Sequence, residues 1–259
     1  MSDFSAWNRI WLETKDDAEF RWWVKREKEG VRGGKIFNYM NKYLGAVQGI
    51  KTIEVGAGSG VYSFIFAKRG AAVTLVDYSQ EALMLASKCF SSSGIRASFL
   101  EMNALKPFSN LRGKFDLAMS FGTIEHYRSP ERFQMAKAHL DLVRPGGVIV
   151  ISVPNRLFFP HEMLKSCLQK ENKWHLGYEG AFRRQELFQL AGRLGLKNAK
   201  VCGSAFISDL IRYFYIFQDT GFFRKFCKIR FRGAFIRDFT SPLDDLLGAD
   251  IFLMGCKEN

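Results

Sequence analysis

The stretch Glu54-Val-Gly-Ala-Gly-Ser-Gly60 decides the fold. It takes in the end of a short apolar run over residues 51–55, which predicts a strand, and it leads into a helical pattern over residues 60–69. Glycines at such a place let the chain turn tightly and bring backbone N–H groups against a ligand. Because an open α/β sheet presents its ligand crevice at the carboxyl ends of the strands, we expect a nucleoside ligand at this turn.

Two acids indicate what the ligand carries: Glu54 distinguishes between classes of nucleoside ligand, and Asp77 supports a nucleoside of either class. Glu54 precedes the first glycine by two residues, where it would repel a pyrophosphate but suit a ligand that carries an ammonium and a sulfonium. The spacing is also Gly-x-Gly-x-Gly, not the Gly-x-Gly-x-x-Gly of the nicotinamide fingerprint. Asp77 follows the second predicted strand, and its carboxylate can accept bonds from two ribose hydroxyls, each contributing roughly 1.5–3 kcal/mol.

Short apolar runs and helical patterns alternate over residues 51–155, which predicts βα units and a parallel sheet. Helices are expected at 60–69, 79–90, 129–140 and 183–194. Two segments break the pattern: residues 156–180, which are irregular or helical, and residues 203–248, which form an insertion. Strands are expected at 51–55, 72–76, 97–102, 115–120, 147–153, 197–202 and 250–254.

Four stretches in order resemble the successive motifs of class I S-adenosylmethionine-dependent methyltransferases: residues 54–60, 76–79, 115–121 and 142–148. Residues 123–126 and 144–155 are most similar to the small-molecule branch that includes the quinone-biosynthesis methyltransferases. The resemblance implies an α/β fold, a Rossmann-like doubly wound sheet of seven strands with an antiparallel last strand. The methyltransferase domain would then span 51–259, with the helical insertion (203–248) before the last strand. An N-terminal helical segment (1–50) precedes this domain, and its aromatic residues Trp7, Trp11, Phe20, Trp22 and Trp23 predict either a lid over the site or simple packing on the domain.

The same resemblance implies a binding site for S-adenosylmethionine. The glycine turn would lie under the methionine and ribose parts of the cofactor, and Asp77 would bind the ribose. Tyr78 would flank the adenine, whose edge would meet residues 103–104, while residues 120–121 would approach the methionine end through backbone groups. The expected cofactor-binding residues are Glu54, Gly56, Ala57, Gly58, Gly60, Asp77, Tyr78, Asn103, Ala104, Ser120 and Phe121.

His126 is the expected catalytic residue, because it follows the fourth strand and can act as a base for an acceptor that must lose a proton. Relatives with a Glu-x-x-Glu-His pattern can hold a divalent metal, but the upstream position here is Gly122, so no metal is expected. His161, His175 and Tyr178 are further candidates for contact with the acceptor, with a solvated or structural role as the alternative.

The composition bears on location and partners. The 259 residues include 38 basic and 26 acidic side chains, a net charge of +12 that favours an anionic partner. Five scattered cysteines argue against a disulfide framework or a zinc site. With no visible signal peptide or membrane span, we expect a cytoplasmic protein. Residues 221–237 alternate phenylalanine with arginine and lysine, which predicts either peripheral membrane contact or a helical cap with its rings turned into the core.

Three functions stay open at this stage. The first is methyl transfer to a small-molecule or lipid-linked acceptor. The second is methylation of a nucleic acid such as RNA, which the positive charge favours. However, residues 120–125 lack the Asn/Asp-Pro-Pro-aromatic loop of enzymes that methylate base amines, and no RNA-binding appendage is recognisable. The third is a non-catalytic, regulatory protein that binds S-adenosylmethionine, because a fold does not dictate an activity.

Overall fold

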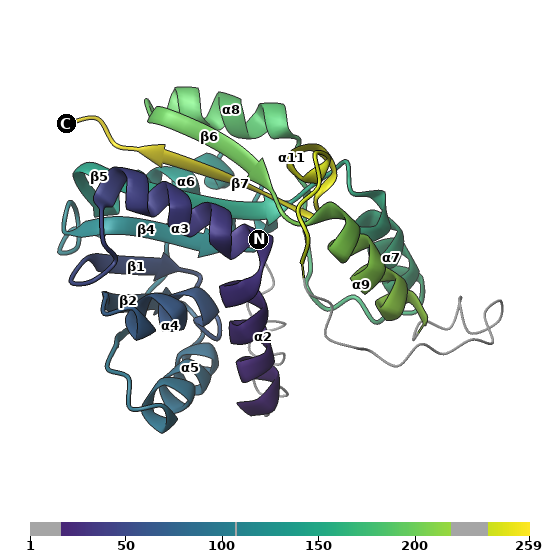
Figure 1. Ribbon diagram of the computed structural model, residues 1–259, viewed down its shortest axis with the longest axis horizontal. Coiled ribbons are helices and arrows are strands. Elements are labelled where there is room, and N and C mark those ends of the chain that lie inside the picture. Colours follow the sequence, from purple (N-terminus) through teal and green to yellow (C-terminus); the bar gives the residue numbers. More distant parts are fainter. Residues whose placement is uncertain (1–16, 107, 219–237) are drawn as a thin grey trace.

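A computed structural model describes residues 17–106, 108–218 and 238–259 of the chain. These residues form a seven-stranded sheet in the order β3-β2-β1-β4-β5-β7-β6 (Figure 1). Neighbours among the first five strands are parallel, whereas β7 is antiparallel to both β5 and β6, which confirms the predicted sheet. The strands are β1 (Lys51–Val55), β2 (Ala72–Asp77), β3 (Ser98–Glu101), β4 (Phe115–Phe121), β5 (Val143–Pro154), β6 (Lys197–Gly203) and β7 (Asp250–Cys256).

Apolar side chains cover both faces of the sheet, as expected for strands that are buried on both sides. Along β4, Leu117 and Met119 belong to one core and Ala118 belongs to the other. The first core includes side chains of α2 (Asp17–Glu29), α3 (Val31–Leu44), α4 (Val61–Lys68) and α5 (Gln80–Ser92). The second includes side chains of α6 (Glu131–Leu142) and α8 (Arg184–Arg193).

The start of β5 differs from the prediction. The strand was expected over 147–153, but β5 already begins at Val143, which pairs with Phe115 of β4. Between these points the strand is held by Lys257: the Gly146 N–H donates to the carbonyl of Lys257, and the Lys257 N–H donates to the carbonyl of Gly147. The strand therefore continues through a sequence that is typical of a turn.

The two segments that break the βα pattern contribute helices at one end of the sheet. Residues 156–180 contain α7 (Phe159–Lys170), and the insertion contains α9 (Phe206–Gln218) and α11 (Asp244–Leu247). α7 and α9 lie side by side beyond the sheet (Figure 1), joined by the ring contact between Phe158 and Tyr213, whose centroids are 4.9 Å apart. The basic aromatic segment 221–237 lies outside the described residues.

Among the helices of the described residues, none has the length and hydropathy that crossing a bilayer requires.

Candidate active site

The turn between β1 and α4 needs glycine at two positions for different reasons. Gly56 has a φ of +64°, and a Cβ there would come within 2.5 Å of the Thr123 side chain. Gly60 begins α4 with a φ of +71°, and a Cβ there would come within 2.3 Å of the Leu75 side chain. Both are left-handed conformations that other residues rarely adopt. The turn therefore packs closely against the ends of β2 and β4.

Glu54 and Asp77 are buried carboxylates beside this turn. Oε2 of Glu54 accepts bonds from the Ser63 backbone N–H at 2.9 Å and from the Ser63 hydroxyl at 2.5 Å. Asp77 accepts from the N–H groups of Gly58 and Ser79, each at 2.9 Å. Burial raises the pKa of Glu54 to about 7 and also raises the pKa of Asp77. A cation or hydroxyl donors bound between them would offset this desolvation.

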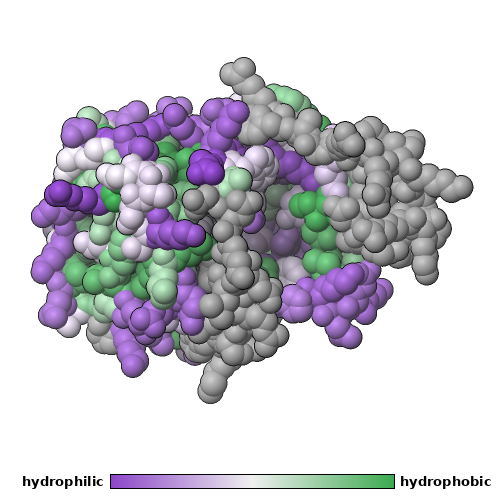
Figure 2. Space-filling model, turned by 90° about the horizontal axis from the view of Figure 1, so that it is seen from below, coloured by the Kyte–Doolittle hydropathy of each residue, from purple (hydrophilic) through white to green (hydrophobic). Residues whose placement is uncertain are grey.

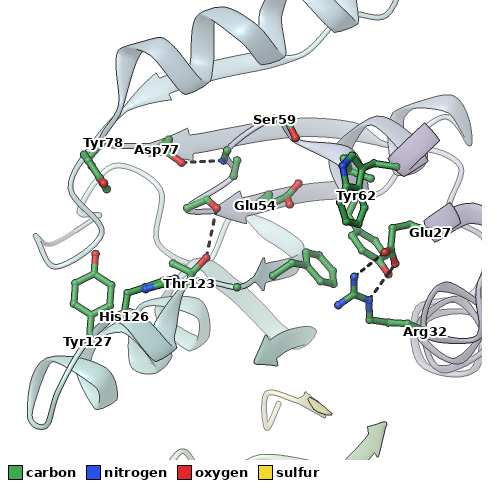
Figure 3. A pocket seen from close by; sticks show the side chains of 17 residues that line it. Glu27, Arg32, Glu54, Ser59, Tyr62, Asp77, Tyr78, Thr123, His126 and Tyr127 are labelled. Carbon is green, nitrogen blue, oxygen red and sulfur yellow. Dashed lines mark hydrogen bonds and ion pairs between the residues drawn. The ribbon is translucent and has the colours of Figure 1, made fainter. Parts of the chain in front are cut away.

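The turn and the two acids line a cavity of about 300 Å³ (Figure 3). Eight residues of the expected site contribute to its wall, namely Glu54, Gly56, Ala57, Gly58, Asp77, Tyr78, Phe121 and His126. Two further lining residues belong to segments expected near the site, namely Trp23 of the N-terminal segment and Ser59 of the glycine turn. The remaining lining residues were not expected from the sequence as parts of a binding site, and they are Glu27, Arg32, Val61, Tyr62, Gly122, Thr123 and Tyr127.

Four expected residues do not line this cavity: Gly60, Asn103, Ala104 and Ser120. Gly60 does not touch the cavity but permits the left-handed turn that leads into α4. The Asn103 side-chain oxygen accepts a bond from the Leu105 N–H at 2.9 Å, which is the turn-forming role of asparagine. Ser120 is fully buried in β4, and its hydroxyl has no hydrogen-bond partner among the described residues. Their roles in cofactor binding remain predictions.

The N-terminal helices supply a charged wall of the cavity. Glu27 of α2 lies 2.8 Å from Nη2 of Arg32 in α3 and accepts a bond from the Tyr62 hydroxyl at 2.6 Å (Figure 3). Nη1 of Arg32 reaches Asp250 of β7 at 2.7 Å. Burial alone would raise the pKa of Glu27, but Arg32 beside it brings that pKa down to about 2. This cluster therefore stays ionised and ties the helices to the sheet.

The tryptophan-rich N-terminal segment was expected to act as a lid. Trp23 of α2 does line the cavity. The ion pair between Glu27 and Arg32 could not be predicted from the sequence. The two residues lie in a mostly charged segment, 25–32, that is typical of a solvated surface.

His126 lies at the other end of the cavity, in the short turn η1 (Ile124–His126) that follows β4. Its Nδ1 is 2.9 Å from the carbonyl oxygen of Tyr178. Because a carbonyl can only accept, Nδ1 carries the proton and Nε2 is the basic nitrogen. Burial lowers the pKa of His126, so the ring is neutral at pH 7.

A buried acid accompanies His126. Oε1 of Glu125 lies 3.9 Å from Nε2 of His126, and its Oε2 has no hydrogen-bond partner among the described residues. Glu125 is 2% exposed, and this burial raises its pKa well above the ordinary value. Burial therefore favours the protonated form of this carboxyl.

The three candidates for acceptor contact have different surroundings. Tyr178 contacts His126 through its carbonyl group, and its ring stacks on the Arg128 guanidinium at 3.8 Å. His161 is held between Glu179, at 2.6 Å, and the Tyr213 hydroxyl, at 2.8 Å. His175 is exposed. Of the three, only Tyr178 contacts His126, at Nδ1, and it does not line the cavity; His161 reaches the neighbouring Glu179, and His175 is at the surface.

Comparisons with known proteins agree with this geometry. The family model described as a methyltransferase domain matches residues 53–147. A ubiquinone biosynthesis O-methyltransferase of Shewanella halifaxensis is 30% identical over 189 residues, which are 68% of this chain and 76% of that protein. A protein of the same description from Pseudomonas aeruginosa is 30% identical over 140 residues, 52% of this chain and 59% of the relative.

Solved structures share the fold. Magnesium protoporphyrin IX methyltransferase from Synechocystis, determined with bound S-adenosylhomocysteine, superposes with a TM-score of 0.56 at 15% identity. The superposition covers 98% of this chain and 94% of the other. The similarity therefore extends over the N-terminal helices and the last strand as well as the matched domain.

Proposed function

Because the chain belongs to the class I S-adenosylmethionine-dependent methyltransferases, we propose that it methylates an oxygen atom of a small or lipid-linked acceptor. S-adenosylmethionine is its cofactor. The observation that carries the proposal is a single cavity that joins the glycine turn, the two buried acids and His126. The description shared by the two curated relatives, ubiquinone biosynthesis O-methyltransferase, supports oxygen as the acceptor atom.

The cavity wall fits the cofactor in its donors and charges. When bound, S-adenosylmethionine supplies an electrophilic methyl group on a positively charged sulfur. Glu54 would face the cationic methionine part, Asp77 would accept from the ribose hydroxyls, and the turn at 56–58, which has no large side chain, would let the cofactor lie close to the backbone. Arg32, the guanidinium on the opposite wall, would bind the carboxylate of the methionine part.

Positioning and proton removal are the two tasks left to the chain. Methyl transfer is an in-line displacement, so holding the acceptor in line supplies much of the rate. An acceptor hydroxyl must also lose its proton, and Nε2 of the neutral His126 can take it, an effect worth about 10²–10⁴ in rate. Because burial makes His126 a weak base, it suits an acidic hydroxyl such as a phenol better than an aliphatic alcohol.

A lipid-linked acceptor is supported by the surface of α7 and α9. Phe159 and Met163 of α7 are exposed, as are Leu210 and Phe214 of α9. Figure 2 shows apolar surface beside hydrophilic surface toward the side where these helices lie. We propose that this face, together with the basic aromatic segment 221–237, lets a cytoplasmic enzyme contact a membrane that holds its acceptor. Equal pelleting with anionic vesicles of the full chain and of a form lacking residues 221–237 would argue against a role for that segment.

Incubation with cell extract and methyl-labelled S-adenosylmethionine tests the function. The extract is then separated into lipid, RNA, protein and small molecules. We expect label in lipids or small molecules, in bonds that resist mild alkali as methyl ethers do, and we expect the His126→Gln variant to lose it while still binding S-adenosylhomocysteine. Label in RNA would overturn the proposal in favour of a nucleic-acid substrate. No label in any fraction, with binding intact, would favour a regulatory protein.

A further inference from the structure

The carbonyl that binds His126 belongs to a backbone segment that is fixed from several sides. In residues 178–180, the Gly180 N–H donates to the carbonyl of Glu125 at 3.0 Å. Nη2 of Arg132 donates to the carbonyl of Gly180 at 3.0 Å and to that of Glu125 at 3.3 Å. Residues 178–180 are therefore hydrogen-bonded, directly and through Arg132, to the turn that contains His126.

α7 holds the segment from the other side. Nζ of Lys165 donates to the carbonyl of Glu179 at 2.6 Å, and Nε2 of His161 lies 2.6 Å from Oε1 of Glu179. Nδ1 of His161 is in turn 2.8 Å from the Tyr213 hydroxyl of α9. Lys165 and Glu179 are largely withdrawn from water, with side chains 12% and 5% exposed, so these bonds are stronger than surface ion pairs.

We propose that Lys165 and Glu179 are positioning residues for His126: anchored by α7, they hold the Tyr178 carbonyl against Nδ1 and so keep Nε2 as the basic nitrogen. Neither side chain lines the cavity of about 300 Å³, so each acts through the backbone and through its charge. The inference rests on the proposed function of His126 as the base.

The charges of the two residues act on His126 in opposite directions. Burial is the largest influence and lowers the pKa of His126, whereas the bond to Tyr178 raises it. The Glu179 carboxylate raises this pKa further, and the Lys165 ammonium lowers it. The other titratable or charged groups around His126 are Glu125 on its own turn, whose pKa is raised by burial, Arg132 of α6, His161 of α7, and Tyr127 on the cavity wall.

Nitrogen-15 NMR of the histidine rings tests the proposal without any acceptor. The chain has four histidines, which His→Gln variants assign one by one. We expect wild-type His126 to be the Nδ1–H tautomer. Lys165→Met should raise its pKa and Glu179→Gln should lower it, each by about 0.5–1 pH unit, and both should increase the share of the other tautomer. Lys165→Arg, which keeps the donor and the charge, should resemble the wild type.

Two controls separate positioning from general damage. Lys170→Met removes an exposed lysine from the same helix and should leave His126 unchanged. His139, buried in α6 with Nδ1 2.8 Å from the Met135 carbonyl, is a reference ring within every sample. Shifts of His126 with the same sign in both variants, no shift in either, or equal changes at His139 would each overturn the proposal.

The result is distinct from that of the methylation experiment. If His126→Gln keeps full methyl transfer while the opposite pKa shifts and the tautomer changes both appear, the role of His126 as base fails and the positioning stands. If methyl transfer needs His126 and the shifts are absent, the positioning fails alone.

Discussion

The charge of Glu54 should make cofactor binding depend on pH. With a pKa of about 7 in the cofactor-free protein, Glu54 is ionised in about half of the molecules at pH 7 and in about one hundredth at pH 5. If only the carboxylate attracts the cationic methionine part, affinity falls about fiftyfold over this range. Glu54→Gln should remove most of that slope and weaken binding about 10–100-fold at pH 7, the equivalent of roughly 1.5–3 kcal/mol for a charge-assisted bond.

The same carboxyl should destabilise the cofactor-free fold. The folded-state pKa of about 7 exceeds the ordinary value of 4.5, so the folded state binds more protons than the unfolded state between these values. The contribution to the free energy of unfolding is therefore fully present below pH 4.5 and is lost as the pH rises through 7, by roughly 3 kcal/mol. Glu54→Gln should raise the Tm of the cofactor-free protein at pH 8, by several degrees.

Calorimetry with S-adenosylmethionine at pH 5, 6 and 7, at constant ionic strength, measures the first effect, and thermal unfolding without cofactor measures the second. Glu101→Gln is the matched control, because Glu101 also ends a strand of the sheet but is exposed and does not line the cavity. Any slope that persists in Glu54→Gln belongs to Asp77, whose pKa is also raised. A wild-type affinity that stays within about threefold from pH 5 to pH 7 would refute the reasoning.

Three further outcomes are expected. Asp77→Asn should weaken binding of S-adenosylhomocysteine about 10–100-fold in calorimetry, through loss of charge-assisted bonds to the ribose; binding of wild-type strength would remove Asp77 from the site. Gly60→Ala should lower the free energy of unfolding by roughly 2–4 kcal/mol, against about 1–2 kcal/mol for Gly94→Ala, which has a similar φ but an open surrounding; equal losses would contradict the packing argument. Arg32→Met leaves the buried Glu27 with only the longer ion pair to Arg26, at 3.9 Å, and should cost about 3–5 kcal/mol in denaturant unfolding. Glu27→Gln in the same chain should restore most of this loss; additive losses would contradict the pairing.

Local patterns predicted the sheet and the cofactor side of the site. Residues 54–60 predict the end of a strand, a tight turn and the start of a helix. Asp77 was predicted by the same reasoning, because it stands at the carboxyl end of the next strand. The eight expected residues that line the cavity all lie within, or directly after, such a unit. Their positions follow from strand ends, and strand ends can be recognised from the sequence.

The rest of the cavity depends on contacts between distant parts of the chain. In the sequence, Glu27 and Arg32 are typical of a solvated charged helix. They are buried because Arg32 bonds to Asp250 and Glu27 bonds to Tyr62, and both partners are distant in the sequence. The bond between His126 and the Tyr178 carbonyl joins residues 52 positions apart. Every residue has a backbone carbonyl, so the sequence pattern cannot indicate which one accepts this bond. The start of β5 was missed for the same reason, because its partners, Phe115 and Lys257, are far from it in the sequence.

The bond between Arg32 and Asp250 also bears on the order in which the protein assembles. It joins residues 218 positions apart, and Asp250 begins the strand that is inserted between β5 and β6. During synthesis the glycine turn, Glu54, Asp77 and His126 leave the ribosome long before β7 does. Arg32 on the N-terminal wall of the cavity can reach its final position only after β7 is free to pair. A nascent chain therefore carries most of the residues that line the cavity before the pocket can close.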